Sequence, residues 1–451
     1  MTVSADLIGD AYSAAHVWDV LERLTDVESR AAGSDGEMEA ARILAETFER
    51  YDCNNVERRQ FSIPGWTRGR SALTVHGESD RQYDRSHQVL ALPRSPAATV
   101  TAPLIDLGDG VPPEFAETDL DGAIVLVSSA TPATSDRWIH RTEKYYRAVE
   151  AGATGFIFAN EQVGCLPATG NVGSGDGAGA IPAVGVSREL GSRLARTCER
   201  GDPSVTLTVD CENERTTSQS VTATLGPETG PEVLVTAHHD AHDISEGATD
   251  NAAGCAVVTE VARLLATATR DLETRVRFVT FGAEELHLLG SEAWAAETDP
   301  ETVRAVINLD GVGSSRDPVV STHGIDAIGA AFEATSDDLG VPIELDDGLV
   351  PWGDQWPFVY RGIPGAMVTA KDDGDALRGW GHTHADTLDK VDRRDLRALA
   401  VPTTAAVTEL LAAEDVDRRS PEEIREAAVE EGHAEGMRMT GVWPWESASQ
   451  D

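Results

Sequence analysis

Apolar residues recur along the chain in two patterns, and the alternation of these patterns predicts a mixed α/β protein. Several short runs are rich in β-branched and aromatic residues, as is typical of buried strands. These runs lie at 233–237, 276–281, 305–309 and 366–370. After each run, further along the chain, apolar residues return every three or four positions, as in an amphipathic helix. These segments lie at 252–266, from 289 onward, at 325–336 and at 392–413. Strands that alternate with helices of this length indicate a mostly parallel, mixed sheet sandwiched by helices.

The N-terminal region carries the same patterns in a different order. Residues 14–24 and 37–50 predict two amphipathic helices. Residues 58–75 then alternate in polarity like strands and contain a Pro-Gly turn. We therefore assign residues 1–96 to the N-terminal part of the domain that contains the later strands.

Residues 97–215 interrupt this domain and predict a small, β-rich insert. The insert contains a buried-type strand at 123–127, a helix at 141–151 and a second strand at 155–159. The expected domains are the N-terminal part at 1–96, the insert at 97–215, the main α/β body at 216–415 and a charged helical tail at 416–451.

The charge of the chain is extreme. Its 451 residues include 77 acidic and 37 basic side chains, which gives a formal net charge of 37 − 77 = −40, and only three of the basic residues are lysines. Such a charge disfavours a nucleic-acid partner. A body with this much like charge repels itself unless salt shortens the Debye length to about 3 Å, as at 1 M. We interpret the composition as adaptation to a high-salt cytosol. The alternative is an acidic protein from a cell of ordinary salt content, but such proteins usually concentrate their charge in one tail, whereas here Asp and Glu are spread over the whole length.

The ends and the cysteines predict an intracellular protein. The sequence starts without a basic segment followed by an apolar one, so no signal peptide is expected. No uncharged apolar run reaches the ~18 residues of a membrane span, and we expect no membrane partner. The five cysteines form no C-x-x-C pair and are expected to be isolated thiols.

Candidate chemistry gathers where the predicted strands end. His238-His239-Asp240 follows the first strand, and Asp250 stands before the next helix. Each of the next two strands is also followed by carboxylates, and an H-T-x-x-D-T sequence precedes the last long helix. These further candidates are Glu284, Glu285, Asp310, His382 and Asp386. Singly each has an ordinary explanation as a cap or a solvated side chain, but parallel sheets place their sites at the carboxyl ends of strands.

The donor set suits zinc. Two imidazoles with three carboxylates are ligands that zinc accepts in roughly tetrahedral sites. Asp250, Glu285 and Asp310 contribute a charge of −3, and a hydroxide adds −1, which balances two Zn²⁺ ions. A single zinc would leave buried carboxylates uncompensated.

The order of these motifs resembles a known family. H-x-D, G-A-x-D-N-A-x-G, E-E followed by L-x-G-S, N-x-D-x-x-G and H-T-x-x-D-T are similar to those of the co-catalytic di-zinc aminopeptidases, a metallopeptidase family that also includes glutamate carboxypeptidase-like enzymes. The insert resembles a protease-associated domain through its segments at 121–127, 148–155 and 181–187. The resemblance implies the zinc exopeptidase fold, of the phosphorylase/hydrolase-like kind, and an aminopeptidase acting on peptide substrates.

The same resemblance implies roles for individual residues. His238 and Asp310 would hold one Zn²⁺, Glu285 and His382 the other, and Asp250 would bridge the two. Glu284 would be the general base for a zinc-bridging hydroxide. Asp240 would orient His238, because a metal-bound imidazole needs its other N–H fixed. Co²⁺ is expected to be able to replace zinc, and a cis peptide bond is implied after Asp250.

Some features depart from the family pattern and leave alternatives open. His287 stands where the family has Gly, and His384 where it has Pro; these two, with His239 and His242, are interpreted as non-ligands. Tyr360 and Trp352 are candidates for stabilising the reacting carbonyl oxygen, with nothing in the sequence to choose between them.

The remaining alternatives concern function. A carboxypeptidase or dipeptidase would need a clamp for a terminal carboxylate, for which Arg361 and Arg378 are candidates. A metal-free scaffold is less favoured because all five ligands and Glu284 are present. A single-zinc aminoacyl cyclase is less favoured because the charges balance two metal ions. Homo-oligomerisation and side-chain preference stay open.

Overall fold

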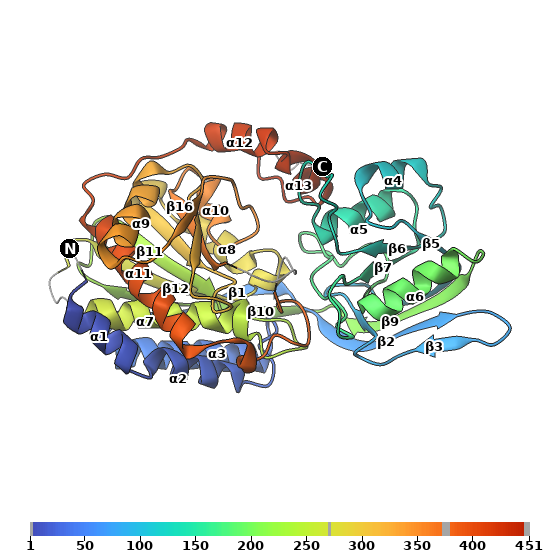
Figure 1. Ribbon diagram of the computed structural model, residues 1–451, viewed down its shortest axis with the longest axis horizontal. Helices are drawn as coiled ribbons and strands as arrows, with labels where there is room; N and C mark the ends of the chain where they lie inside the picture. Colours follow the sequence, from blue (N-terminus) through green and yellow to red (C-terminus); the bar gives the residue numbers. More distant parts are fainter. Residues whose placement is uncertain (1–2, 269–271, 372–378, 446–451) are drawn as a thin grey trace. The chain divides into compact units, whose positions relative to one another are not determined.

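The computed structural model describes residues 3–268, 272–371 and 379–445, and the chain divides into two compact units (Figure 1). The first unit comprises Met1–Ile63, Thr217–Gly381 and Asp386–Ala428, and the second comprises Pro64–Thr216, His382–Ala385 and Val429–Asp451. Each unit has its own sheet and its own buried core.

The sheet of the first unit has the strand order β1-β10-β12-β11-β13-β16-β14-β15. Its strands are β1 (Asn54–Pro64), β10 (Arg215–Leu225), β11 (Glu232–His238), β12 (Arg275–Phe281), β13 (Val303–Leu309), β14 (Pro318–Ser321), β15 (Glu344–Asp346) and β16 (Gly365–Ala370). The central strands β12, β11, β13 and β16 are parallel, whereas β10 pairs antiparallel with β12 and β14 pairs antiparallel with β16. The last strand, β15, is parallel to β14. The expected fold class, a mostly parallel mixed sheet, is therefore confirmed.

Helices cover both faces of this sheet because its central strands are apolar on both sides. Along β11, Val233 and Val235 join one buried cluster and Leu234 joins another, since alternate residues reach opposite faces. The first cluster includes side chains of α2, α3, α7, α9 and α11, and the second includes side chains of α8 and α10. The helices of the unit are α1 (Ala5–Ser13), α2 (His16–Thr25), α3 (Asp35–Arg50), α7 (Ala253–Ala268), α8 (Leu289–Glu297), α9 (Asp326–Leu339), α10 (Trp356–Val359), α11 (Arg393–Ala412) and α12 (Pro421–Glu430), whose last two residues lie beyond the C-terminal boundary of the unit. The short helical turns are η1 (Ala248–Ala252), η2 (Glu284–Leu286), η3 (Pro300–Thr302) and η4 (Leu388–Lys390).

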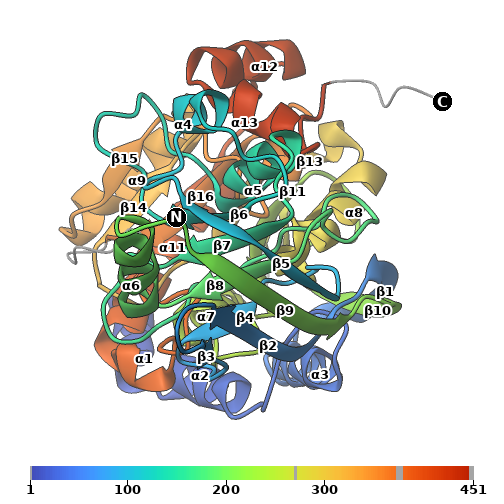
Figure 2. The same cartoon turned by 90° about the vertical axis from the view of Figure 1, so that its right-hand side faces the viewer.

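The second unit contains a mixed sheet of order β3-β2-β9-β5-β6-β7-β8-β4 (Figure 2). Strands β5 to β8 are parallel, and the remaining pairs are antiparallel. The strands are β2 (Thr67–Val75), β3 (Arg81–Tyr83), β4 (Val89–Ala91), β5 (Ala98–Asp106), β6 (Ile124–Ser128), β7 (Gly155–Ala159), β8 (Ala183–Val186) and β9 (Ser204–Glu212), and the helices are α4 (Pro112–Glu117), α5 (Arg141–Glu150), α6 (Arg188–Cys198) and α13 (His433–Met439).

This unit begins earlier than the insert drawn from the sequence. Residues 67–91, assigned above to the N-terminal part of the main domain, form β2, β3 and β4 of the second sheet. Residues 429–445, assigned above to a separate tail, also belong to this unit, where α13 packs on α5. Alternating polarity marks a segment as a strand but does not say which sheet it joins, because pairing depends on distant partners.

Two further expectations concern the described residues. No helix among them is long and apolar enough to cross a membrane. The five cysteines are free thiols, as expected.

Candidate active site

Parallel register brings the predicted site residues of the first unit to one edge of its sheet. His238, the last residue of β11, lies opposite Phe281, the last residue of β12. Glu284, the first residue of the turn η2, therefore lies just beyond the same ends of the strands. Asp310 follows β13, which pairs with β11 on its other side. Asp250 reaches the edge from η1, directly before α7.

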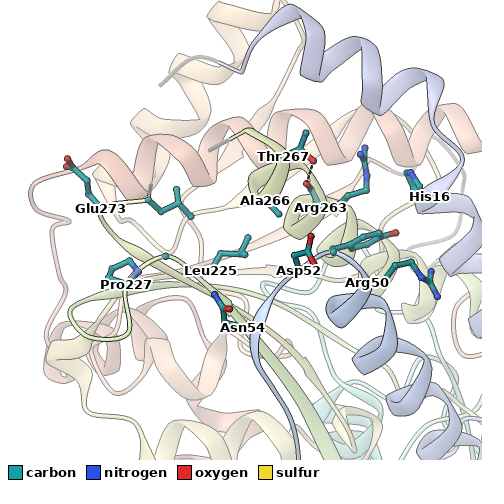
Figure 3. A pocket seen from close by; sticks show the side chains of 13 residues that line it. His16, Arg50, Asp52, Asn54, Leu225, Pro227, Arg263, Ala266, Thr267 and Glu273 are labelled. Atoms are coloured by element: carbon teal, nitrogen blue, oxygen red, sulfur yellow. Dashed lines mark hydrogen bonds between the residues drawn. The ribbon is translucent and has the colours of Figure 1, made fainter. Parts of the chain in front are cut away.

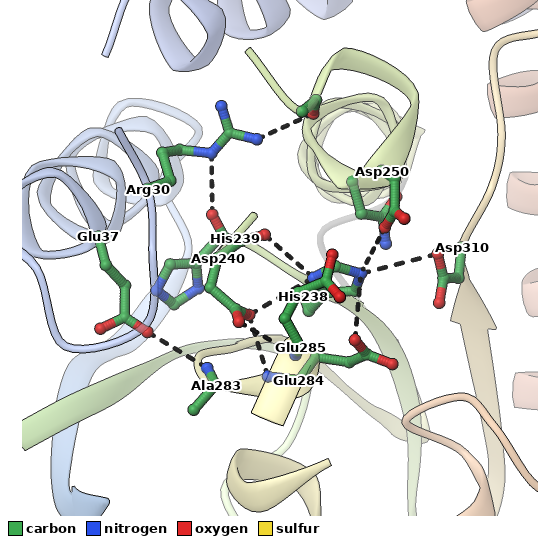
Figure 4. Close-up of polar contacts among 12 residues, drawn as sticks. Arg30, Glu37, His238, His239, Asp240, Asp250, Ala283, Glu284, Glu285 and Asp310 are labelled. Carbon is green, nitrogen blue, oxygen red and sulfur yellow. Dashed lines mark hydrogen bonds and ion pairs between the residues drawn. The ribbon is translucent and has the colours of Figure 1, made fainter. Parts of the chain in front are cut away.

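Three of these side chains converge on one point (Figure 4). The Nε2 atom of His238 is 3.2 Å from Oδ1 of Asp250 and 3.7 Å from Oδ1 of Asp310, and these atoms form a group able to hold a metal ion. Two ligands bonded to one tetrahedral zinc at about 2.0–2.1 Å lie about 3.3 Å apart. The His238 side chain is 1% exposed, and its Nε2 has no hydrogen-bond partner among the described residues. A buried imidazole nitrogen that faces two carboxylates in this way fits a zinc ligand.

The carboxylates dominate the protonation of His238. Burial alone lowers the pKa of its imidazole. The negative charge of Glu284 and the nearby carboxylates of Asp240, Asp250 and Asp310 outweigh burial and hold the pKa well above its ordinary value. Without a metal, the site therefore attracts a positive charge at His238, and a bound cation would take over that role.

Asp240 connects His238 to the turn that carries Glu284 and Glu285 (Figure 4). Its carboxylate accepts hydrogen bonds from the backbone N–H groups of Glu284 (3.0 Å) and Glu285 (3.1 Å). The Nδ1 atom of His238 lies 3.4 Å from Oδ1 of Asp240 and 3.1 Å from its backbone oxygen. Burial raises the pKa of Asp240, but the hydrogen bond and charge of His238 lower it more, so Asp240 is an ionised acceptor. One buried carboxylate thus positions two segments of the site.

Glu284 is placed to exchange protons close to the convergent group. Its Oε2 is 3.9 Å from Nε2 of His238, and its side chain is 12% exposed. Burial raises the pKa of Glu284 well above its usual range, and the charges of Glu285 and Asp310 raise it further. The neighbouring Glu285 turns to a different partner, because its Oε2 is 2.8 Å from Nε2 of His242.

Asp386 fixes the segment that carries Asp250. Its carboxylate accepts hydrogen bonds from the backbone N–H of Thr249 (2.7 Å), the hydroxyl of Thr249 (2.7 Å) and the backbone N–H of Asp250 (3.1 Å). The Asp250–Asn251 peptide bond is cis, as the resemblance implies. The side chain of Asn251 donates to the carbonyl of Leu309 (2.9 Å), which ties this segment to the end of β13.

His382 is described with the second unit. Its backbone oxygen accepts from the N–H of Thr169 (3.0 Å), and its Nδ1 lies 3.3 Å from the carbonyl oxygen of Thr169. Along the chain, His382 directly follows Gly381 and precedes Asp386 by four residues, and both of these belong to the first unit.

Arg30 and Glu37 are buried residues that support the site, and neither belongs to one of the motifs that mark the site in the sequence. Arg30, 2% exposed, donates to the carbonyls of His239 (3.0 Å), Glu246 (2.6 Å) and Gly247 (2.9 Å), and also to that of Leu24. It therefore holds the loop between His238 and Asp250 (Figure 4). Gly247 has φ +56°, and a Cβ there would lie 2.7 Å from Nη2 of Arg30, so only glycine fits.

Glu37 supports the other side of the site from α3. Its carboxyl group accepts from the backbone N–H groups of Gly33 (2.7 Å) and Ala283 (3.2 Å) and from the hydroxyl of Ser218 (2.6 Å). Ser34 caps α3 by accepting from the N–H of Glu37, so the S-x-x-E capping pattern was the one signal available in the sequence. That pattern predicts the helix start but not the contact with Ala283.

Tyr360 and Arg361 are engaged with a single carboxylate. The Tyr360 hydroxyl donates to Glu292 (2.6 Å), and the Arg361 guanidinium donates to both oxygens of the same side chain. In this arrangement Arg361 is not an open clamp for a terminal carboxylate. The other candidate, Arg378, lies outside the described residues.

A separate groove of about 1010 Å³ lies in the first unit and contains none of the predicted site residues (Figure 3). It is lined by Arg263, Ala266 and Thr267 of α7 and by residues of other segments, such as His16 and Leu225. Arg263 is 13 positions after Asp250, or about 20 Å along a helix that rises 1.5 Å per residue. Its guanidinium is bound by Glu260 and Asp10. This groove is therefore not the site of the predicted chemistry.

Comparisons with known proteins agree with the arrangement of the chain. The model of peptidase family M28 matches residues 220–406, and that of the PA domain matches residues 100–194. Aminopeptidase YwaD of Bacillus subtilis is 28% identical over 411 residues, which cover 88% of this chain and 85% of the relative.

Solved structures give the same result. A zinc aminopeptidase from Bacillus subtilis has a TM-score of 0.69 at 28% identity and covers 87% of this chain and 94% of its own. A peptidase M28 precursor from Shewanella amazonensis has a TM-score of 0.76 at 24% identity, with 92% of this chain and 97% of its own covered, and shares the fold.

Proposed function

The chain belongs to peptidase family M28 and carries an inserted PA domain, and on this premise we propose that it is a zinc-dependent aminopeptidase that releases N-terminal residues from peptides. The observation that carries the proposal is the convergence of His238, Asp250 and Asp310, with Glu284 beside them. The aminopeptidase activity named for the relatives supports the choice of substrate end.

The proposed cofactor is a pair of zinc ions. His238 and Asp310 would hold one ion, Glu285 and His382 the other, and Asp250 would bridge them. The distances of 3.2 and 3.7 Å from Nε2 of His238 support the first position. For the second, Glu285 lies at the same strand edge, and only three residues of chain separate His382 from Asp386, whose carboxylate accepts from the N–H of Asp250. Three carboxylates and a −1 ligand balance two divalent ions.

Each protein group then has a defined task. Bound zinc supplies a lowered pKa for a water molecule and polarises the carbonyl of the scissile bond. The Oε2 atom of Glu284 takes the proton of the attacking water and returns it to the leaving amine, a role that its position 3.9 Å from Nε2 of His238 supports. Asp240 keeps the Nδ1 side of His238 fixed, so that Nε2 points at the metal position.

The carboxypeptidase and dipeptidase alternative receives less support. It calls for a cationic group that is available to a terminal carboxylate. Arg361 is already held by Glu292. A metal-free scaffold is also disfavoured, because the carboxylates at the strand edge would then repel one another without benefit.

The salt adaptation, the location and the partners of the enzyme are also part of the proposal. The net charge of −40, spread over the whole sequence, supports a halophilic protein of a high-salt cytosol. We propose peptides as its partners, neither nucleic acid nor a membrane surface, and leave homo-oligomerisation open. If salt screens the self-repulsion, the melting temperature rises with KCl concentration between 0.1 and 3 M; a melting temperature indifferent to salt would contradict the halophilic reading and leave the peptidase proposal standing.

Two measurements in multimolar KCl test the function. Elemental analysis after mild dialysis is expected to give two zinc ions per chain, and one or none would end the co-catalytic proposal. A matched panel of free, N-acetylated and C-amidated dipeptides is expected to show cleavage of the free and C-amidated members and none of the N-acetylated ones. Loss of activity on C-amidation instead would assign a carboxypeptidase.

A further inference from the structure

His242 lies against one of the predicted metal ligands without belonging to any family motif. It stands in the loop between β11 and η1, and its side chain is 5% exposed. Its Nε2 is 2.8 Å from Oε2 of Glu285, whose own side chain is 7% exposed. A buried imidazole at this distance from a ligand carboxylate is either a further ligand or a support for the ligand.

The distance separates these two roles. Two ligands of one tetrahedral zinc lie about 3.3 Å apart, because each is about 2.0–2.1 Å from the metal. The two distances from His238, 3.2 Å to Asp250 and 3.7 Å to Asp310, bracket this value. His242 and Glu285 also belong to a group of side chains able to hold a metal ion. The 2.8 Å between them, however, is shorter than the ligand separation and has the length of an N–H···O⁻ hydrogen bond.

We infer that His242 is a positioning residue whose Nε2–H donates to Oε2 of Glu285. The inference rests on the proposed zinc function, since it gives a purpose to the orientation of Glu285. Asp240 already holds the backbone N–H of Glu285, so its main chain and its carboxylate are fixed by different partners. The bond to His242 also stabilises a carboxylate that adjoins Glu284, where like charges would otherwise push the two side chains apart.

The consequence is selective for one metal position. Glu285 serves the ion that it is proposed to share with His382, whereas His238 and Asp310 serve the other. Loss of the hydrogen bond should therefore weaken one zinc and spare its neighbour. Removing an outer hydrogen-bond partner of a metal ligand typically costs about 10–100-fold in metal affinity.

The test compares His242→Phe, which removes the donor, with His242→Gln, which keeps an N–H donor on a shorter side chain. Zinc is titrated calorimetrically into metal-free protein in 2 M KCl, and Co²⁺ is then bound so that its visible absorption reports the ligand set. His76→Gln is the matched control, because it replaces a histidine of the second unit whose ring nitrogens contact Asp80 and Thr206. Circular dichroism of each metal-free variant checks that it is folded.

For His242→Phe we expect one zinc dissociation constant to rise about 10–100-fold while the other stays within twofold of the unmodified protein. His242→Gln should lose less, and its cobalt bands should keep their positions because no ligand has been removed. Unchanged zinc affinity in both variants would overturn the inference, as would a shift of the cobalt bands, which would make His242 a ligand. Absence of zinc binding by the unmodified protein would defeat the proposed function itself, and is thus distinguishable.

Discussion

Replacing Arg30 by methionine should both destabilise the first unit and loosen its metal site. The guanidinium makes four hydrogen bonds to backbone carbonyls, three of them in the loop that joins His238 to Asp250. Burial lowers the pKa of Arg30, against the raising influence of nearby groups such as Cys255 and Asp386. A methionine fills much of the volume but supplies no donor.

The size of the effect follows from the carbonyls that lose their partner. A buried acceptor left without a hydrogen bond costs about 1–3 kcal/mol, and water reaching part of the space keeps each cost near the lower end. Leu24 and Gly247 keep a second donor, because their carbonyls also accept from the N–H groups of Val27 (3.3 Å) and Ala252 (3.0 Å). The carbonyls of His239 and Glu246 then give a loss of about 2 kcal/mol, a sizeable share of the about 5–15 kcal/mol that typically holds a domain folded. For a unit of this size the melting temperature should fall by roughly 5 °C.

The assay is guanidinium-induced and thermal unfolding in 2 M KCl, with and without saturating zinc. Zinc binds only the folded site, so its stabilisation depends on the logarithm of its affinity. If Arg30 positions the loop, zinc stabilises Arg30→Met less than the unmodified protein, and Arg30→Lys falls between them because an ammonium can satisfy only some of the carbonyls. A loss below about 1 kcal/mol with an undiminished zinc effect would refute this account.

Three other outcomes follow from contacts described above. Glu284→Gln should keep both zinc ions and the fold but lower kcat about 10²–10⁴-fold, because it removes the proton acceptor without touching a ligand; retention of more than about a tenth of kcat would reassign the base. Burial, and then the charge of Asp240, raise the pKa of Glu37 to about 8 from an ordinary value near 4.5. Between these two pH values the folded state holds a proton that the unfolded state releases, so the free energy of unfolding falls as the pH rises. Glu37→Gln should flatten that fall, by up to about 1.4 kcal/mol per pH unit, in denaturant unfolding of zinc-free protein at pH 5, 6.5 and 8; parallel curves for the two proteins would count against it. In the second unit the fully buried ammonium of Lys144 donates to the carbonyls of Asp109 (2.6 Å), Ser128 (2.9 Å) and Ala130 (2.6 Å). Lys144→Met should therefore lower the free energy of unfolding, measured by thermal unfolding, by about 3 kcal/mol. The control Lys371→Met, which replaces an exposed lysine, should lower it by less than about 0.5 kcal/mol.

The central sheet could be predicted because its information is local. Each inner strand is a short apolar run followed by a helix, and the ends of parallel strands fall at one edge whatever the details of packing. The strands β11, β12, β13 and β16 therefore lie where the apolar runs do. The short strands β14 and β15 at one end of the sheet could not be predicted, because three or four residues carry too little alternation of polarity to stand out.

The supporting residues could not be predicted for a different reason. Arg30 and Glu37 lie some 200 positions from the site segments that they bind, and nothing in their neighbourhood marks them as buried. His242 was visible but was interpreted as a non-ligand; its contact with Glu285 depends on the path of a loop. Local sequence fixes which groups can carry chemistry, whereas the groups that hold them in place are chosen by the tertiary fold.

The protein carries negative charge on surface carboxylates and on buried ones, and different ions neutralise the two sets. Surface carboxylates are reached by salt, whose Debye length of about 3 Å at 1 M screens their repulsion. The buried carboxylates of the first unit are shielded from these ions. Burial raises the pKa of Glu284 well above its usual range, and it raises to about 7 the pKa of Asp354, a buried residue just before α10. In the zinc-free protein these groups are neutralised in part by protons, which the arrival of a divalent cation would displace. Salt therefore cannot substitute for zinc, and zinc cannot substitute for salt, because each acts on charges that the other does not reach.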